Sequence, residues 1–205
     1  MIKFFQNREL SQQLGVNLAR WKRWSREFLP PDPLGGLQSG YARQYNLDDA
    51  FTVYLGGYLV SELKFSIPEA KKILSDLKEW MTSHCFYYYY NHINGKNSPH
   101  DTPTAHYRIH IYLARTKDIE AYQIIYRIKR LIADGSMDLN GENIVVEQTV
   151  EERIDMSLKS SENNTAADDF FRRLGARVIH LTALFHHFLE LLELTWIVEG
   201  SGKTD

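Results

Sequence analysis

Hydrophobic residues recur with helical spacing in four segments of the first third of the chain, and each segment predicts a helix. The segments are residues 7–14, 18–28, 47–63 and 67–81. Each starts at or just after a polar residue suited to N-capping: Asn7, Asn17, Asn46 and Ser66. Glu69 completes a capping box with Ser66, and Gly15 is suited to a left-handed turn between the first two helices. Two short helices joined by such a turn form the skeleton of a helix-turn-helix.

The helix predicted over residues 18–28 has two chemically different sides. Its apolar side is formed by Leu18, Trp21, Trp24 and Phe28. Its opposite side is formed by Lys22, Arg23 and Arg26, with Arg20 on the flank. Because the apolar side can pack on the first helix, the cations are expected to face solvent. Trp21 is expected in the core, whereas Trp24 suits the core and a contact surface equally well.

A loop rich in proline and glycine, residues 31–40, follows this helix, and residues 39–45 can form a short strand after it. Together they predict a β-hairpin, or wing. Tyr41, Arg43 and Tyr45 would lie on this wing, where a cation and phenolic hydroxyls can hold phosphate groups.

Residues 84–158 show a different pattern. Apolar and polar side chains alternate from 106 to 113, which predicts a half-buried strand. The apolar positions in 121–132 have helical spacing, and residues 144–146 begin another strand. The order strand, helix, strand predicts a small α/β domain. Its aromatic and imidazole groups favour either a ligand pocket or an aromatic core, and the candidate ligand-binding residues are Tyr88, Tyr90, His106, His110 and Tyr112.

A long helix is predicted over residues 166–198, after a polar linker over residues 159–165. Its large apolar residues repeat in heptads from 171 to 195, a pattern typical of a dimerisation seam. We therefore expect this helix to hold a homodimer. The alternative is that it packs on the middle domain of its own chain.

Charge is distributed unevenly along the 205 residues. Residues 1–45 carry seven Lys or Arg against three acids, so the rest of a chain of net charge −2 carries −6. A basic head on an acidic body is typical of a regulator with one DNA-facing module. The single cysteine, Cys85, excludes an intramolecular disulfide. The chain contains no signal peptide and no long apolar run, so a cytoplasmic, nucleoid-associated location is expected.

The order of these features resembles the DNA-binding domain of MerR-family regulators. The motifs that carry the resemblance are Gly15-Val16, Lys22 with Trp24, Arg43-Gln44-Tyr45, and Phe65-Ser66-Ile67-Pro68-Glu69. They span roughly residues 3–80. The resemblance implies a winged helix-turn-helix that binds double-stranded DNA at a palindromic operator as a homodimer. RNA polymerase and a small-molecule effector are further candidate partners.

The sequence thus predicts an α+β protein in three parts. These are a MerR-like winged helix-turn-helix over 1–82, an α/β effector or interaction domain over 84–158, and a long C-terminal dimerisation helix over 166–198. The residues expected to contact DNA are Asn17, Arg20, Lys22, Arg23, Arg26, Tyr41, Arg43 and Tyr45. No cofactor or metal is expected. An enzyme is not expected either, because no nucleophile–base pair, phosphate loop or acidic dyad stands at recognisable spacing.

The function predicted is that of a sequence-specific transcriptional regulator. An architectural or recombination accessory protein of the excisionase type uses the same winged fold and is the alternative. Recognition of one palindrome per dimer would favour the regulator, whereas cooperative coating of non-specific DNA would favour the alternative.

Overall fold

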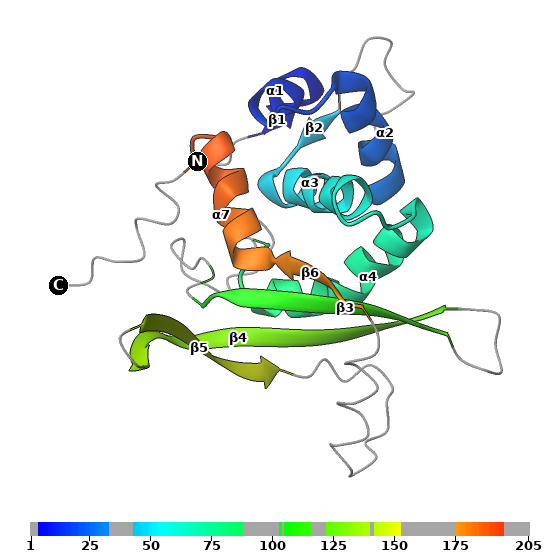
Figure 1. Ribbon diagram of the computed structural model, residues 1–205. Coiled ribbons are helices and arrows are strands. Elements are labelled where there is room, and N and C mark those ends of the chain that lie inside the picture. Colours follow the sequence, from blue (N-terminus) through cyan, green and yellow to red (C-terminus); the bar gives the residue numbers. More distant parts are fainter. Residues whose placement is uncertain are drawn as a thin grey trace. The chain divides into compact units, whose positions relative to one another are not determined.

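The computed structural model describes residues 4–32, 43–87, 103, 105–115, 122–139, 142–152 and 175–194 (Figure 1). The chain divides into two compact units. The helical unit contains Met1–Thr104 and Phe185–Asp205, and the sheet unit contains Ala105–Leu184. Mixed helices and antiparallel sheets agree with the α+β class predicted from sequence. In the described ranges, no helix has the length and apolar character needed to span a bilayer.

The helical unit contains the helices that were predicted for the first third of the chain. Its elements are β1 (Phe5–Gln6), α1 (Asn7–Gln13), α2 (Leu18–Phe28), β2 (Gln44–Tyr45), α3 (Leu47–Ser61), α4 (Ile67–Ser83) and the part of α7 (Leu181–Leu191) that begins at Phe185. The four predicted helices are therefore confirmed, with ends that differ by at most two residues. The prediction that Asn7 caps the first helix is wrong, because Asn7 is the first helical residue and Gln6 occupies the N-cap position.

Local signals fix the ends of these helices. Gly15 has φ +63°, the left-handed conformation that the turn between α1 and α2 requires. The Asn17 side chain caps α2 by accepting hydrogen bonds from the N–H groups of Ala19 at 2.9 Å and Arg20 at 3.3 Å. The backbone N–H of Ser66 donates to the Glu69 carboxylate at 2.7 Å, as the predicted capping box requires.

Two glycines allow α2 and α3 to approach closely. A Cβ added to Gly57 would lie 2.3 Å from the Trp24 ring, and one added to Gly56 would lie 2.5 Å from the Phe28 ring. Both distances are too short for real atoms. The glycines therefore form the surface on which the apolar side of α2 rests, and they determine which side of α2 faces outward.

A short strand was predicted over residues 39–45, and β2 lies at its end, at Gln44–Tyr45. Its described partner is β1, with Phe5 opposite Tyr45 and Gln6 opposite Gln44. The predicted wing hairpin, including Tyr41, falls in residues 33–42, outside the described residues.

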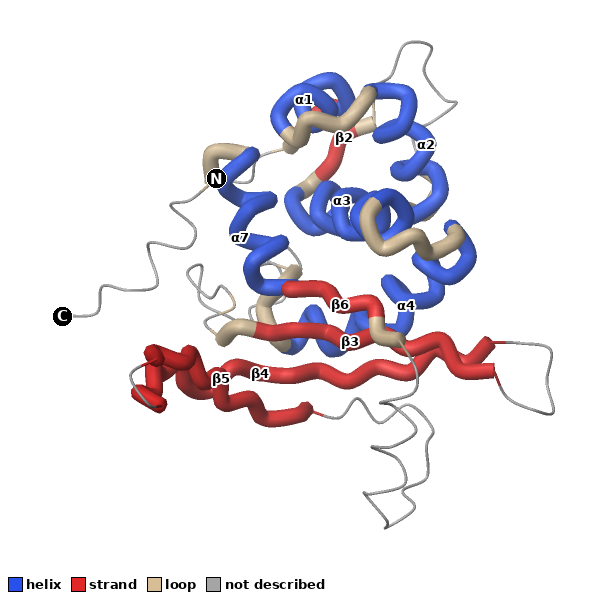
Figure 2. The backbone as a smooth tube through the Cα atoms, in the orientation of Figure 1, coloured by secondary structure: helices blue, strands red, loops and turns tan. Residues whose placement is uncertain are grey.

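The sheet unit contains a four-stranded antiparallel sheet in the order β5-β4-β3-β6 (Figure 2). Its strands are β3 (Tyr107–Arg115), β4 (Tyr122–Leu139), β5 (Glu142–Glu152) and β6 (Arg177–His180). The predicted strands at 106–113 and 144–146 are confirmed. Side chains alternate along β3 as expected, with Ile109 and Ile111 almost fully buried on one face.

The helix predicted over residues 121–132 is wrong, because residues 122–132 lie in β4. Ile124 and Ile128 stand four residues apart, and that spacing places two side chains on one face of a helix and also on one face of a strand. In the structure they lie opposite Leu113 and Ile109 of β3. The β-branched isoleucines suit this pairing.

The single long helix predicted over 166–198 is also wrong. Residues 177–180 form β6, which pairs with β3, and α7 spans only Leu181–Leu191. The predicted segments 166–174 and 195–198 lie outside the described residues. His180 ends the strand and His187 lies in the helix, so these two imidazoles do not share one helical face.

Two of the apolar residues expected to form a dimer seam, Phe185 and Phe188, are buried within the helical unit. Phe185 is 1 % exposed and Phe188 is 0 % exposed. Their ring centroids lie 4.8 and 5.2 Å from that of Phe51 in α3. The heptad pattern correctly indicates an apolar helix face. This face packs on α3 of the same chain. Neither arrangement expected from the sequence, an intermolecular seam or packing on the middle domain, describes this contact.

Candidate nucleic-acid interface

The second helix, α2, separates its aromatic and cationic side chains to opposite sides. Trp21 is 0 % exposed and Trp24 is 7 % exposed, so both tryptophans belong to the core. This confirms the prediction for Trp21 and decides the alternative left open for Trp24. The cationic side chains of the same helix are exposed: Arg20, Lys22, Arg23 and Arg26. The structure thus brings together on one surface four of the residues predicted to contact DNA.

The only acid of α2, Glu27, is engaged by another helix. Its carboxylate lies 2.7 Å from the Lys71 ammonium of α4. This hydrogen bond and the charge of Lys71 lower the pKa of Glu27, and the charges of Arg23 and Arg26 lower it further. Glu27 therefore stays ionised and paired with α4, and the exposed side of α2 carries excess positive charge.

Asn17, Arg43 and Tyr45 have structural roles in addition to, or in place of, the predicted DNA contacts. The side-chain oxygen of Asn17 accepts the two capping hydrogen bonds of α2. Arg43 donates from Nη1 to the carbonyl of Pro30 at 3.0 Å, and its Cζ lies 5.7 Å from the centre of the Tyr45 ring. Arg43 therefore ties the start of β2 to the residues that follow α2.

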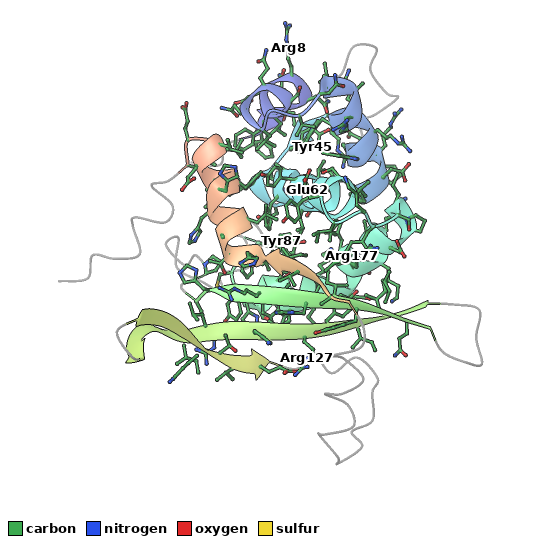
Figure 3. All side chains as sticks on the ribbon, in the orientation of Figure 1. Arg8, Tyr45, Glu62, Tyr87, Arg127 and Arg177 are labelled. Carbon is green, nitrogen blue, oxygen red and sulfur yellow. The ribbon has the colours of Figure 1, made fainter. Side chains whose placement is uncertain are left out.

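Tyr45 is a core residue, which corrects its assignment to the wing surface. It is 1 % exposed, and its ring packs edge-on against Trp21 with centroids 5.8 Å apart (Figure 3). Its hydroxyl donates to Asn7 Oδ1 at 2.6 Å. The single phenolic proton is used in that bond, so at the 2.7 Å contact with Ser25 the serine hydroxyl donates. The Tyr45 hydroxyl therefore has no proton left to donate to a phosphate oxygen.

A cleft of about 480 Å³ adjoins the cationic side of α2, and sequence reasoning missed it. Arg20, Arg23 and Trp24 form one wall, and Glu62 and Lys64, at and after the end of α3, contribute to the other. The Arg20 guanidinium lies 6.0 Å from the centre of the Trp24 ring. No spacing in the sequence predicts this neighbourhood, because it depends on how α2 packs against α3.

The predicted ligand-binding residues are only partly described. Tyr88 and Tyr90 lie outside the described residues. His106 precedes β3, and His110 and Tyr112 share a face of β3. His106 is exposed, His110 is half-buried and Tyr112 is 7 % exposed.

Positive charge surrounds His110 on this sheet face. Burial lowers the pKa of its imidazole, and the charges of Lys129, Arg127, Arg108 and His180 lower it further. His110 lies directly opposite Arg127 across the strands. Arg127 in turn pairs with Glu151 of β5 (Figure 3). This charge distribution disfavours binding of a cationic ligand to this sheet face.

Comparison of the chain with protein-family models, with curated proteins and with solved structures found no match. Function must therefore be argued from the geometry of the chain itself. In the described ranges, no three His, Cys, Asp or Glu side chains are placed to hold a metal ion together. The exposed cations of α2 are a surface that can hold phosphate oxygens or base edges.

Proposed function

We propose that this protein is a DNA-binding transcriptional regulator that contacts duplex DNA through the cationic side of α2. The observation that carries the proposal is the exposure of four cations on a helix whose opposite side is buried: Arg20, Lys22, Arg23 and Arg26. A helix can enter the major groove, and an arginine there can pair through two hydrogen bonds with guanine.

The connection between α1 and α2 supports the proposal. The helices are joined by a short turn in which Gly15 is left-handed and Asn17 caps α2. A second helix presented after such a turn is the recognition helix of a helix-turn-helix. The proposal accordingly assigns residues 1–82 to a MerR-like winged helix-turn-helix, with the wing predicted from sequence over residues 31–45. The burial of the Trp21 side holds α2 at a fixed rotation, so the same side chains would always face DNA.

The proposal includes a homodimer on a palindromic operator. Two recognition helices that read one face of the duplex are held about 34 Å apart. Phe185 and Phe188 are buried against α3 of their own chain, so this dimer would form through other residues. Control by a ligand or partner through residues 84–158 belongs to the same proposal.

Selection of bound duplexes from random DNA, with the full-length chain, tests this function. Regulation predicts enrichment of one palindromic sequence. Arg23→Ala and Arg26→Ala should each weaken binding to that sequence by about 1–3 kcal/mol and relax the preference for particular bases. The matched control is Lys72→Ala, which removes one positive charge from α4, where Lys72 pairs with Asp76 at 3.0 Å.

Three results would contradict the proposal. Equal affinity of Arg23→Ala, Arg26→Ala and the parent chain would remove α2 as the contact surface. An equal loss in Lys72→Ala would show that net charge alone matters. Cooperative coating of all sequences, with no enriched site, would favour an architectural or recombination accessory protein.

A further inference from the structure

A larger cleft of the helical unit, of about 620 Å³, opens between the end of α2, the first half of α3, and α4. Its volume lies within the range of about 300–1,000 Å³ that small-molecule sites occupy. Phe28 and Leu74 contribute apolar surface, and the Phe28 ring is fixed by its contact with Gly56. We call it the Asp49 cleft, after the carboxylate in its wall.

Four charged residues line the Asp49 cleft: Asp48, Asp49, Lys71 and Lys78. Asp49 is half-buried and Lys78 is exposed, and neither side chain makes an ion pair with another described residue. Burial raises the pKa of Asp49, while the charge of Arg43, a hydrogen bond from the Asn46 backbone and the charge of Lys78 act in the opposite direction. The other lysine of the wall, Lys71, is already bound to Glu27. Asp49 and Lys78 are thus a carboxylate and an ammonium available to a ligand.

The buried hydroxyl of Tyr87 lies in the same wall, and its proton makes no hydrogen bond of normal length to any residue that the structure describes. Tyr87 is 6 % exposed, and its hydroxyl lies 3.4 Å from Thr52 Oγ1 (Figure 3). Thr52 has one proton and donates it to the carbonyl of Asp48 at 2.8 Å. Tyr87 is therefore left with one long contact, beyond the usual range for two hydroxyls. Burial raises the pKa of Tyr87, and the charges of Asp48 and Asp49 raise it further, so the group remains a hydrogen-bond donor.

We propose that the Asp49 cleft binds a small zwitterion of the amino-acid type with an apolar side chain. The ligand ammonium would lie against Asp49, its carboxylate against Lys78 and the Tyr87 hydroxyl, and its apolar part against Phe28 and Leu74. A ligand with a single charge matches the cleft less well. An amine would meet the repulsion of Lys78, and a carboxylate would meet that of Asp49.

This site is separate from the cationic side of α2 and from the residues predicted to bind a ligand in the middle domain. Its test reads ligand binding directly and without DNA. A failure of the DNA-binding proposal therefore leaves the result for the Asp49 cleft unaffected, and the reverse also holds.

The experiment titrates the full-length protein with four probes and follows its backbone amide NMR signals. L-phenylalanine and L-leucine are the zwitterions, phenethylamine carries only the positive charge, and 3-phenylpropanoate carries only the negative charge. We expect the zwitterions to shift the amide signals of residues 28–29, 46–52 and 71–82. Each singly charged probe should bind at least tenfold more weakly, a difference of about 1.4 kcal/mol.

Variants identify the groups responsible. Asp49→Asn and Lys78→Gln should each weaken phenylalanine binding about tenfold or more, and Lys72→Gln, on the same helix as Lys78 but outside the cleft, should leave it unchanged. Phenethylamine binding as tightly as phenylalanine would overturn the zwitterion assignment. The absence of shifts in these segments with all four probes at millimolar concentration would overturn the site itself.

Discussion

The packing of α7 on α3 makes a prediction about Phe188 that distinguishes a core residue from a dimer-seam residue. Phe188 is 0 % exposed, and its ring centroid lies 5.2 Å from that of Phe51 and 5.3 Å from that of Tyr54. Replacing a buried phenylalanine with alanine costs about 3–5 kcal/mol, from lost burial and the cavity that remains. Since a domain is stable by about 5–15 kcal/mol, Phe188→Ala should remove roughly a fifth or more of the free energy of unfolding.

Urea unfolding followed by circular dichroism measures this loss. It should be run at two protein concentrations, because a residue that acts only in a dimer would make stability depend on concentration. The matched control is His187→Ala, the preceding position of α7, whose side chain is 58 % exposed. It should change stability by less than about 0.5 kcal/mol. If Phe188→Ala does not fold, Phe188→Leu should show a loss of smaller size in the same direction.

One result would refute the reasoning. If Phe188→Ala unfolds at the same urea concentration as the parent chain but sediments as a smaller species, Phe188 holds two chains together. The contact with Phe51 would then contribute nothing to the stability of the helical unit.

Three further predictions concern single side chains. Tyr45→Phe should destabilise the protein by about 1–3 kcal/mol in urea unfolding, because the buried Ser25 hydroxyl loses its acceptor. Unchanged stability with weaker DNA binding would instead return Tyr45 to the wing surface. Arg43→Ala should weaken binding similarly on all DNA sequences and make the salt dependence shallower by about one unit in a titration against salt. A loss confined to one base position would show that Arg43 reads bases. The raised pKa of Asp49 means that the folded protein retains a proton above pH 3.8 where the unfolded chain has released it, so stability falls as pH rises through this window. Asp49→Asn should remove that fall and raise stability at pH 7, and an unchanged pH profile in thermal unfolding would contradict the assignment.

The sequence predicted the helical unit well because its signals are local. A left-handed glycine, an asparagine cap and a capping box each act within a few residues, and Gly15, Asn17 and Ser66 behave as their positions indicate. The two sides of α2 were also predictable, since helical period alone separates the tryptophans from the cations.

The features that the sequence did not predict depend on contacts between residues far apart in the chain. Isoleucines four residues apart fit a helix and a strand alike, and only pairing with β3 and β5 makes residues 122–139 a strand. Heptads showed that Phe185 and Phe188 lie on one apolar face but could not name its partner, Phe51. Tyr45 was predicted as a phosphate contact on the wing, and its core position depends on a bond to Asn7, 38 residues away in the chain. The Asp49 cleft requires three helices to meet, so no single segment predicts it.

The helical unit is built from both ends of the chain, with the sheet unit inserted between Thr104 and Phe185. Ribosomes add about 5–20 residues per second, so the α7 phenylalanines follow Phe51 by on the order of ten seconds. During that interval the apolar surface of α3 that α7 will cover is open to solvent in the nascent chain. Exposed apolar surface of this kind favours aggregation and is what chaperones bind. Synthesis of this protein should therefore depend on chaperones more than its length suggests, and chains stopped before α7 should be cleared rather than accumulate.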